Sequence, residues 1–215
     1  SQSPSPGSSG FRTLNANIDA AGNVVSVTFR YLAEGAGLIP VQFVATGLSI
    51  PKDVFLANKA DVMALILAGD DSIIGNDFDN ILHGGAGNDL FMGLGGNDML
   101  YGGESADLLA GGAGADLLDG GAGTDTASYG SGHMNGVTVN LATGEAGGDA
   151  AGDTFVSIEN VLGTRYADTL TAAVSGSTLR GDGGNDVLTG SASADYLFGG
   201  DGVDALYGGH ANDLL

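Results

Sequence analysis

Residues 84–126 read GGAGNDLFM GLGGNDMLY GGESADLLA GGAGADLLD GGAGTDT, a nine-residue unit that repeats without a slip. Its consensus is G-G-x-G-x-D-x-U-x, where U is a large apolar residue. The same phase is already present at Asp71 and Ile73, and it ends at Asp125. A unit of this length is too short for a pair of helices, but it can hold one tight turn and one short strand. Its glycines allow the turn to use positive φ.

A second run of the same unit lies in the C-terminal part of the chain, where it includes GDGGNDVLT (181–189) and GGDGVDALY (199–207). It has a different phase, because the apolar positions Leu118 and Leu170 are 52 residues apart, which is not a multiple of nine. The sequence therefore predicts two repeat blocks, 69–128 and 163–215. They flank an inserted segment, 129–162, with strand-like runs at 137–141 and 154–161.

Two units, 18 residues, make one full coil of turn, strand, opposite turn and opposite strand. Stacked coils place successive strands about 4.8 Å apart in two parallel sheets. The apolar residues of both sheets fill the interior, which no single coil could bury alone. The fold class predicted for the repeats is therefore all-β, with parallel sheets.

Stacking at 18 residues also aligns the repeat carboxylates in columns along the two edges of the coils. In the first block the columns are Asp71, Asp89, Asp107 and Asp125, and Asn80, Asp98 and Asp116. In the second block they are Asp168, Asp186 and Asp204, and Ser177, Asp195 and Asp213.

Carboxylates in such a column repel one another, by roughly 1 kcal/mol per neighbouring pair even at the dielectric constant of water. A divalent cation between coils removes this repulsion. Calcium suits the site because it accepts six to eight oxygens in flexible geometry, whereas magnesium demands a tight octahedron. Zinc prefers His or Cys ligands. The alternative, solvated turn residues that cap their own backbone, does not require Asp at every repeat.

These repeats resemble the RTX (hemolysin-type) calcium-binding nonapeptide family. The resemblance rests on GGAGNDLFM (84–92), GLGGNDMLY (93–101), GGAGADLLD (111–119) and the two C-terminal units quoted above. It implies a two-block parallel β-roll, or β-solenoid, with calcium between the turns on both edges. The carboxylates would be the Asp residues of the columns. The implied carbonyl donors are Gly85, Gly87, Gly96, Gly112, Gly114, Gly184 and Gly202.

Some turns depart from the pattern. Asn80 and Ser177 replace the Asp, and the turn at 172–180 has almost none of the motif. Each block is therefore expected to lose a site, which leaves about six to eight ions for the whole array. In the inserted segment, Asp149 and Asp153 are expected to be plain turn residues. The three histidines, His83, His133 and His210, are expected at the surface.

The N-terminal third of the chain differs from the repeats. Residues 1–10 are rich in Ser, Pro and Gly, which is typical of a linker or tag. In 11–68 we expect short strands at Val24–Tyr31 and Pro40–Val44, followed by a capping helix at about 51–68. Ser49 is the expected N-cap of this helix, and Gly69 ends it.

The composition excludes several classes of protein. The chain has 26 acidic and 6 basic residues, for a net charge of -20, so it lacks the basic clusters that nucleic-acid binding needs. It contains no cysteine, which excludes disulfides and thiolate metal sites. No apolar run approaches the roughly 20 residues of a membrane helix.

The outward positions of the strands are unexpectedly apolar. Ile81, Met99 and Leu117, with Tyr101, should line one outer face of the first block. Ile74, Leu90, Met92 and Leu108 should line the other, and Tyr196, Phe198 and Leu214 form the analogous row in the second block. Contiguous exposed apolar patches usually mark an interface. We therefore expect the 51–68 helix, the N-terminal strands or a partner chain to cover at least one face.

Three functions are compatible with this sequence. The first is a non-catalytic calcium-binding module which, as the resemblance implies, belongs to a secreted bacterial protein that folds on calcium after type I secretion. The second is an adhesive, surface-layer or polysaccharide-binding module, with a protein or glycan partner on an outer face. The third is part of a secreted enzyme such as an epimerase, lipase or protease. The chain itself has neither H-E-x-x-H nor G-x-S-x-G, and we expect no catalytic site in it.

Overall fold

The computed structural model describes residues 69–215 in full and, before them, the backbone of three strands. These strands, β1 (Gly10–Ile18), β2 (Asn23–Leu32) and β3 (Gln42–Pro51), form an antiparallel sheet in the order β1-β2-β3. The strand predicted at Val24–Tyr31 is β2, and the one predicted at Pro40–Val44 overlaps β3. Of the linker predicted at 1–10, Gly10 begins β1 and the rest lies outside the described residues. Ser49, the expected helix N-cap, and Pro51 lie in β3, and residues 52–68 of the expected helix lie outside the described residues.

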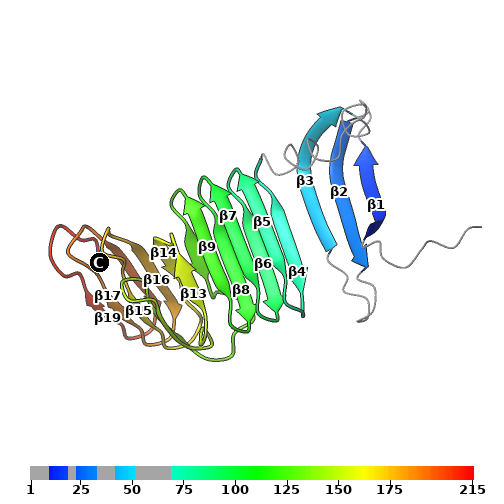
Figure 1. The fold of residues 1–215 in the computed structure, drawn as a ribbon. Coiled ribbons are helices and arrows are strands. Elements are labelled where there is room, and N and C mark those ends of the chain that lie inside the picture. Colours follow the sequence, from blue (N-terminus) through cyan, green and yellow to red (C-terminus); the bar gives the residue numbers. More distant parts are fainter. Residues whose placement is uncertain (1–9, 19–22, 33–41, 52–68) are drawn as a thin grey trace, which may run out of the picture.

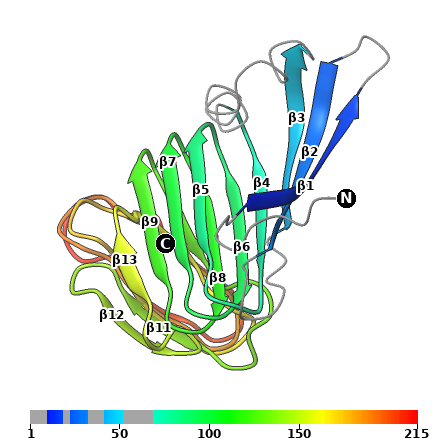
Figure 2. The same cartoon turned by 45° about the vertical axis from the view of Figure 1, so that its right-hand side comes forward.

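From Ser72 onward the chain winds into a roll of parallel strands (Figures 1 and 2). One continuous sheet contains β4 (Ser72–Asn76), β6 (Leu90–Gly95), β8 (Leu108–Ala113), β10 (Thr126–Ser128), β14 (Asn160–Leu162), β16 (Thr178–Gly183) and β18 (Tyr196–Asp201). Two shorter sheets lie opposite. The first contains β5 (Ile81–Ala86), β7 (Met99–Glu104), β9 (Leu117–Ala122) and β13 (Thr154–Val156). The second contains β12 (Glu145–Gly148), β11 (Val137–Asn140), β15 (Thr169–Thr171), β17 (Val187–Thr189) and β19 (Ala205–Tyr207).

The register of the roll follows the 18-residue coil. Leu82 pairs with Leu100, and Leu100 with Leu118, in parallel. The same spacing joins β15 to β17 and β17 to β19. The predicted all-β parallel roll is therefore confirmed. In the described part of the chain no helix is long and apolar enough to cross a membrane.

The core consists mainly of one apolar side chain from each strand of the repeats. Ten of the positions predicted to point inward are buried: Ile73, Leu82, Phe91, Leu100, Leu109, Leu118, Leu170, Leu179, Leu188 and Leu197. At the C-terminal end of the roll, Leu206 is only partly buried, and Leu215, also predicted to point inward, is 62% exposed. The inserted segment adds Tyr129, Val137, Val139 and Val161 to the same cluster. A single continuous core therefore runs through both blocks.

Replacing Leu100 by alanine is expected to lower the free energy of unfolding by about 2–5 kcal/mol, because the side chain is fully buried and leaves a cavity. Urea unfolding in saturating calcium measures the loss. The matched control is Met99→Ala, since Met99 directly precedes Leu100, points outward and is 37% exposed. Its cost should stay below about 1 kcal/mol. Equal losses would show that the inward and outward positions are wrongly assigned.

The inserted segment does not interrupt the roll as the two-block division suggested. β10 pairs with β8 and with β14, so the seven-stranded sheet passes through the insertion. The single strand-like run predicted at 154–161 is two strands, of which β13 extends the sheet of β9 and β14 lies in the opposite sheet. β11 in turn pairs with β15.

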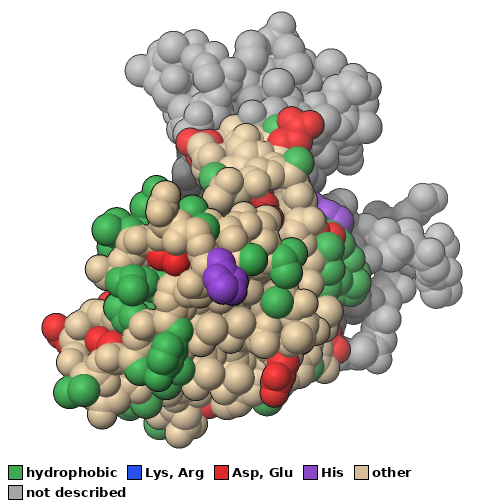
Figure 3. Space-filling view, turned by 90° about the vertical axis from the view of Figure 1, so that its left-hand side faces the viewer, with side chains coloured by type: hydrophobic (Ala, Val, Ile, Leu, Met, Phe, Trp, Pro, Cys, Tyr) green, Lys and Arg blue, Asp and Glu red, His purple; other side chains and the backbone are tan. Residues whose placement is uncertain are grey.

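The outward apolar residues are largely exposed. Ile81 is 65% exposed and Ile74 41%. Figure 3 shows that hydrophobic side chains on one face of the roll lie in separate groups, with backbone and other side chains between them. A groove between the inserted segment and β6 and β8 is lined by Met92 and Leu94, so part of one outer face lies beside the insertion.

Candidate metal centres

The repeat carboxylates form hydrogen-bonded ladders along both edges of the roll. The backbone N–H of Asp71 donates to Oδ1 of Asp89, that of Asp89 to Asp107, and that of Asp107 to Asp125, each at 2.8 Å. On the other edge, Asn80 donates to Asp98 and Asp98 to Asp116, also at 2.8 Å. The predicted columns are thus brought together by the fold.

The same ladder continues in the second block. The backbone N–H of Asp168 donates to Asp186 at 2.9 Å, and that of Asp186 to Asp204 at 3.0 Å. Ser177 donates to Asp195 at 2.6 Å, and Asp195 to Asp213 at 3.0 Å. One oxygen of each acceptor carboxylate therefore has a backbone partner.

The second oxygen of most ladder carboxylates is buried and has no hydrogen-bond partner within the part of the chain that the structure describes. These Oδ2 atoms belong to Asp71, Asp89, Asp98, Asp107, Asp116, Asp125 and Asp186. A buried polar atom left without a partner costs about 1–3 kcal/mol, and a charged one more. So many oxygens at equivalent positions indicate that a ligand outside the chain completes them.

Burial raises the pKa values of the ladder carboxyls. The pKa of Asp71 rises to about 7, first because of burial and then because of the neighbouring charges of Asp89 and Asp70. Burial likewise raises the pKa values of Asp98, Asp107 and Asp186 to about 6. The ladder therefore holds its charges at a cost that a bound cation would remove.

The glycine that opens each turn lies directly over the carboxylate. A Cβ on Gly84 would collide with Oδ2 of Asp89 and with the carbonyl oxygen of Gly102 in the next coil. Gly93 has the same relation to Asp98 and to the carbonyl oxygen of Gly111. Carboxylate and carbonyl oxygens from two stacked turns thus converge on one space. This mixed oxygen set is the one calcium prefers.

The glycines implied as carbonyl donors all adopt positive φ: Gly85, Gly87, Gly96, Gly112, Gly114, Gly184 and Gly202. Among the described residues no three His, Asp or Glu side chains converge on one point. A cation at these turns would therefore depend on backbone carbonyls as much as on carboxylates. This fits calcium better than zinc.

Two predicted ligands already have protein partners for both oxygens. Oδ2 of Asp168 accepts the backbone N–H of Thr164 at 2.7 Å, while Oδ1 accepts the Thr164 hydroxyl and the N–H of Val137. Oδ2 of Asp195 accepts the N–H and the hydroxyl of Ser191, at 2.6 and 3.0 Å. The sequence reading grouped these two Asp residues with the others and missed the roles of Thr164 and Ser191.

Two residues of the insertion continue the ladders, which the sequence reading also missed. Asp153, expected in a plain turn, is buried. Its Oδ1 accepts the N–H of Asp116 at 2.9 Å, and its Oδ2 accepts the hydroxyl of Tyr129 at 2.7 Å. Glu159 accepts the N–H of Asp125 at 2.9 Å. Their distances from these donors, 37 and 34 residues, hide them from a search at the 18-residue spacing.

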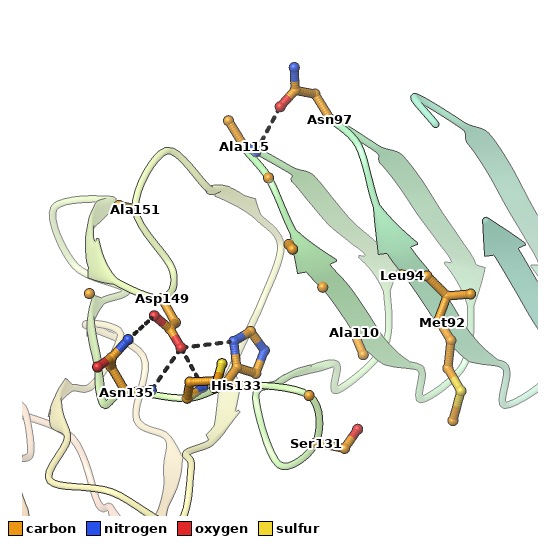
Figure 4. Close-up of a pocket in the computed structure, with 16 residues that line it drawn as sticks. Met92, Leu94, Asn97, Ala110, Ala115, Ser131, His133, Asn135, Asp149 and Ala151 are labelled. Atoms are coloured by element: carbon orange, nitrogen blue, oxygen red, sulfur yellow. Dashed lines mark hydrogen bonds and ion pairs between the residues drawn. The ribbon is translucent and has the colours of Figure 1, made fainter. Parts of the chain in front are cut away.

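Asp149 fixes a loop of the insertion at the groove beside β6 and β8 (Figure 4). It accepts the backbone N–H groups of Met134 and Asn135 and the side-chain amide of Asn135, which together lower its pKa. Nδ1 of His133 lies 3.8 Å away. The His133 side chain is only 8% exposed, so its predicted surface position is wrong, whereas His83 and His210 are exposed as expected.

Comparison with known proteins agrees with the geometry of the turns. No curated protein compared with the chain matches it. The family model described as RTX calcium-binding nonapeptide repeat (4 copies) matches residues 67–100, 101–133 and 179–215. The stretch between the second and third matches contains the Thr164 turn and the divergent turn at 172–177. Residues 67–133 and 179–215 are therefore RTX calcium-binding nonapeptide repeats, within a β-roll that also includes the segment between them.

Proposed function

We propose that this chain is a non-catalytic module of a secreted bacterial protein, and that calcium binding between its stacked turns drives its folding. The observation that carries the proposal is the set of buried carboxylate oxygens without partners. Calcium supplies the positive charge that compensates these carboxylates. Where a metal site forms only in the folded state, its binding free energy becomes folding free energy.

The net negative charge of the chain supports secretion in an unfolded state, followed by folding on calcium outside the cell. With a net charge of -20, the chain repels itself when calcium is scarce and remains extended. Export through a type I secretion system requires such an unfolded chain, and the calcium-rich medium outside then folds it. RTX repeats are typical of secreted bacterial proteins, which agrees with an extracellular or cell-surface location.

A non-catalytic role is supported by the structural hydrogen bonds that the ladder residues make. Ladder carboxylates such as those of Asp107 and Asp116 accept a backbone N–H from the neighbouring coil, and the insertion's Asp153 is held by Tyr129. The described histidines lie on separate elements, and Asp149 serves to hold a loop. The enzyme alternative therefore has no reacting group assigned to it in 69–215.

Calcium binding is tested with a matched pair of variants in one turn. Asp186 lies in a ladder with an unpartnered oxygen, whereas Asp182 is exposed in the same turn. Asp186→Asn should weaken calcium binding about tenfold or more at that turn, because a charged ligand is lost. Asp182→Asn removes the same charge and should leave binding nearly unchanged. Isothermal titration measures both, and the wild type should bind with a Kd of roughly 10⁻⁴–10⁻³ M. Equal effects of the two substitutions would contradict a site at Asp186.

A second candidate function is adhesion through an outer face of the roll. Ile81 and Met99 lie side by side on β5 and β7, and the rings of His83 and Tyr101 stack beside them at 4.8 Å between centroids. Such a row suits a protein or glycan partner. Sedimentation and glycan binding in calcium test this role, and Ile81→Ser should abolish any association found. A monomer that binds no glycan would leave only the first function.

A further inference from the structure

The turns of the roll are of two kinds, which differ in the direction of one backbone N–H. Each turn has six residues, from the opening position, usually glycine, to the ladder residue. In a closed turn, the N–H of the second residue donates to the side chain of the sixth. In an open turn, the second residue has positive φ and no such bond is formed.

Four turns are closed. Thr164 and Ser191 donate to Asp168 and Asp195, and in both turns the hydroxyl of the second residue also accepts the N–H of the fourth, at 2.9 and 3.0 Å. Asn76 builds the same pattern with Asn80 and Phe78. Ala173 donates to the hydroxyl of Ser177 at 2.9 Å. The four differ in sequence, so this arrangement is a recurrent local solution.

Eight turns are open, as judged by positive φ at their second residue: Gly85, Leu94, Gly103, Gly112, Gly121, Asp182, Gly200 and Gly209. Two of these residues are not glycine. Leu94 and Asp182 adopt φ of 80° and 73°, which L-residues avoid. The open form is therefore kept even where the backbone is strained, which points to a compensating interaction at the turn.

The unpartnered carboxylate oxygens follow this division. Those of Asp89, Asp98, Asp107, Asp116, Asp125 and Asp186 all belong to open turns. The carboxylates of the closed turns, Asp168 and Asp195, are fully satisfied by Thr164 and Ser191. In these closed turns the N–H of the second residue thus bonds to the carboxylate oxygen, Oδ2, that has no partner in the open turns.

We propose that closed turns replace calcium with their own N–H and hydroxyl groups, so that calcium binds only between two open turns stacked on one edge. This inference rests on the proposed calcium-binding function and refines it. Four such pairs lie among the turns described in full: 84–89 with 102–107, 102–107 with 120–125, 93–98 with 111–116, and 181–186 with 199–204. This number is below the six to eight ions expected from the sequence.

The middle of the roll is then free of calcium. On the edge that leads into the seven-stranded sheet, Glu159 and the closed turns at 172–177 and 190–195 follow one another. On the other edge, the Tyr129–Asp153 bond and the closed turn at 163–168 stand in the same part of the chain. Two calcium-binding zones are therefore joined by a segment held by protein groups alone.

The chain offers a reciprocal exchange that tests this rule. The closed turn at 190–195 reads GSASAD, and the open turn at 111–116 reads GGAGAD, so they differ only at the second and fourth positions. Ser191→Gly with Ser193→Gly should open the turn at 190–195. This turn is stacked on the open turn at 208–213, so the variant should bind one more calcium ion per chain. Gly112→Ser with Gly114→Ser should close the second turn and remove one.

Equilibrium dialysis counts the ions, and thermal unfolding at a series of calcium concentrations provides a second readout. At limiting calcium the Ser-to-Gly pair should have a lower midpoint than the wild type, because its side-chain bonds are lost, and its midpoint should rise more steeply as calcium is added. Ala192→Gly, at the third position of the same turn, is the control and should leave the ion count unchanged. If the variant with the two Gly-to-Ser substitutions fails to fold, the calcium count of the Ser-to-Gly variant still tests the rule for open and closed turns.

The outcomes separate this inference from the function on which it rests. A wild-type chain that binds no calcium would overturn both. A wild type that binds calcium, with ion counts that do not change in either exchanged variant, would overturn the rule for open and closed turns and leave calcium binding intact.

Discussion

In excess chelator at neutral pH, residues 69–215 are expected to lose the circular dichroism signal of their parallel sheets, and calcium is expected to restore it cooperatively. The reason lies in the ladder. Seven buried carboxylate oxygens have no hydrogen-bond partner among the described residues. Calcium stabilises the folded state alone, because the stacked turns exist only there.

The free-energy cost of these unpartnered oxygens decides whether the roll can stay folded without calcium. At about 1–3 kcal/mol for each unpartnered buried acceptor, seven oxygens cost roughly 7–20 kcal/mol. The whole stability of a typical domain is about 5–15 kcal/mol. Removal of calcium should therefore unfold most of the roll rather than loosen its turns.

Magnesium is the control for this experiment. It has the same charge but keeps its waters and requires a tighter octahedron, so at equal concentration it should restore little of the signal. A folded spectrum in chelator, unchanged by calcium, would show that the ladder does not depend on metal. The calcium sites would then lose their main support.

The arrangement of the roll could be predicted because it depends on spacing alone. Leu82, Leu100 and Leu118 are 18 residues apart and pair across neighbouring coils, and Asp89 and Asp107 follow the same rule. One inward side chain per strand and one carboxylate per turn fix the register. Any slip would bury polar residues and expose the apolar ones.

Three features could not be read from the spacing. Asp153 and Glu159 enter the ladders through an insertion whose length obeys no period. The two strands at 154–156 and 160–162 looked like one run, because the turn between them contains no glycine. The direction of the N–H at Thr164 depends on a peptide orientation that a consensus does not specify. Only the hydroxyl residue at the second position of the turn hints at it.

Acid is expected to replace calcium as a stabiliser of the metal-free roll. Burial raises the pKa of Asp71 to about 7 and those of Asp98, Asp107, Asp153 and Asp186 to about 6, whereas unfolded Asp titrates near 3.9. A group with a raised folded pKa stabilises the fold fully below its unfolded pKa, and this contribution is lost as pH rises through the folded pKa. In chelator, the folded fraction should therefore be higher at pH 4.5 than at pH 7.5.

Calcium should show the opposite dependence, because it binds the carboxylates only after they release their protons. Below pH 6, its apparent affinity should fall by about tenfold per pH unit for each proton displaced. The gain in folded fraction from calcium, large at pH 7.5, should thus shrink toward zero near pH 4.5. Circular dichroism at a series of pH values, with calcium and with chelator, measures both trends. A calcium effect that stays constant from pH 7.5 to 4.5 would mean that the buried carboxylates of the ladder are not its ligands.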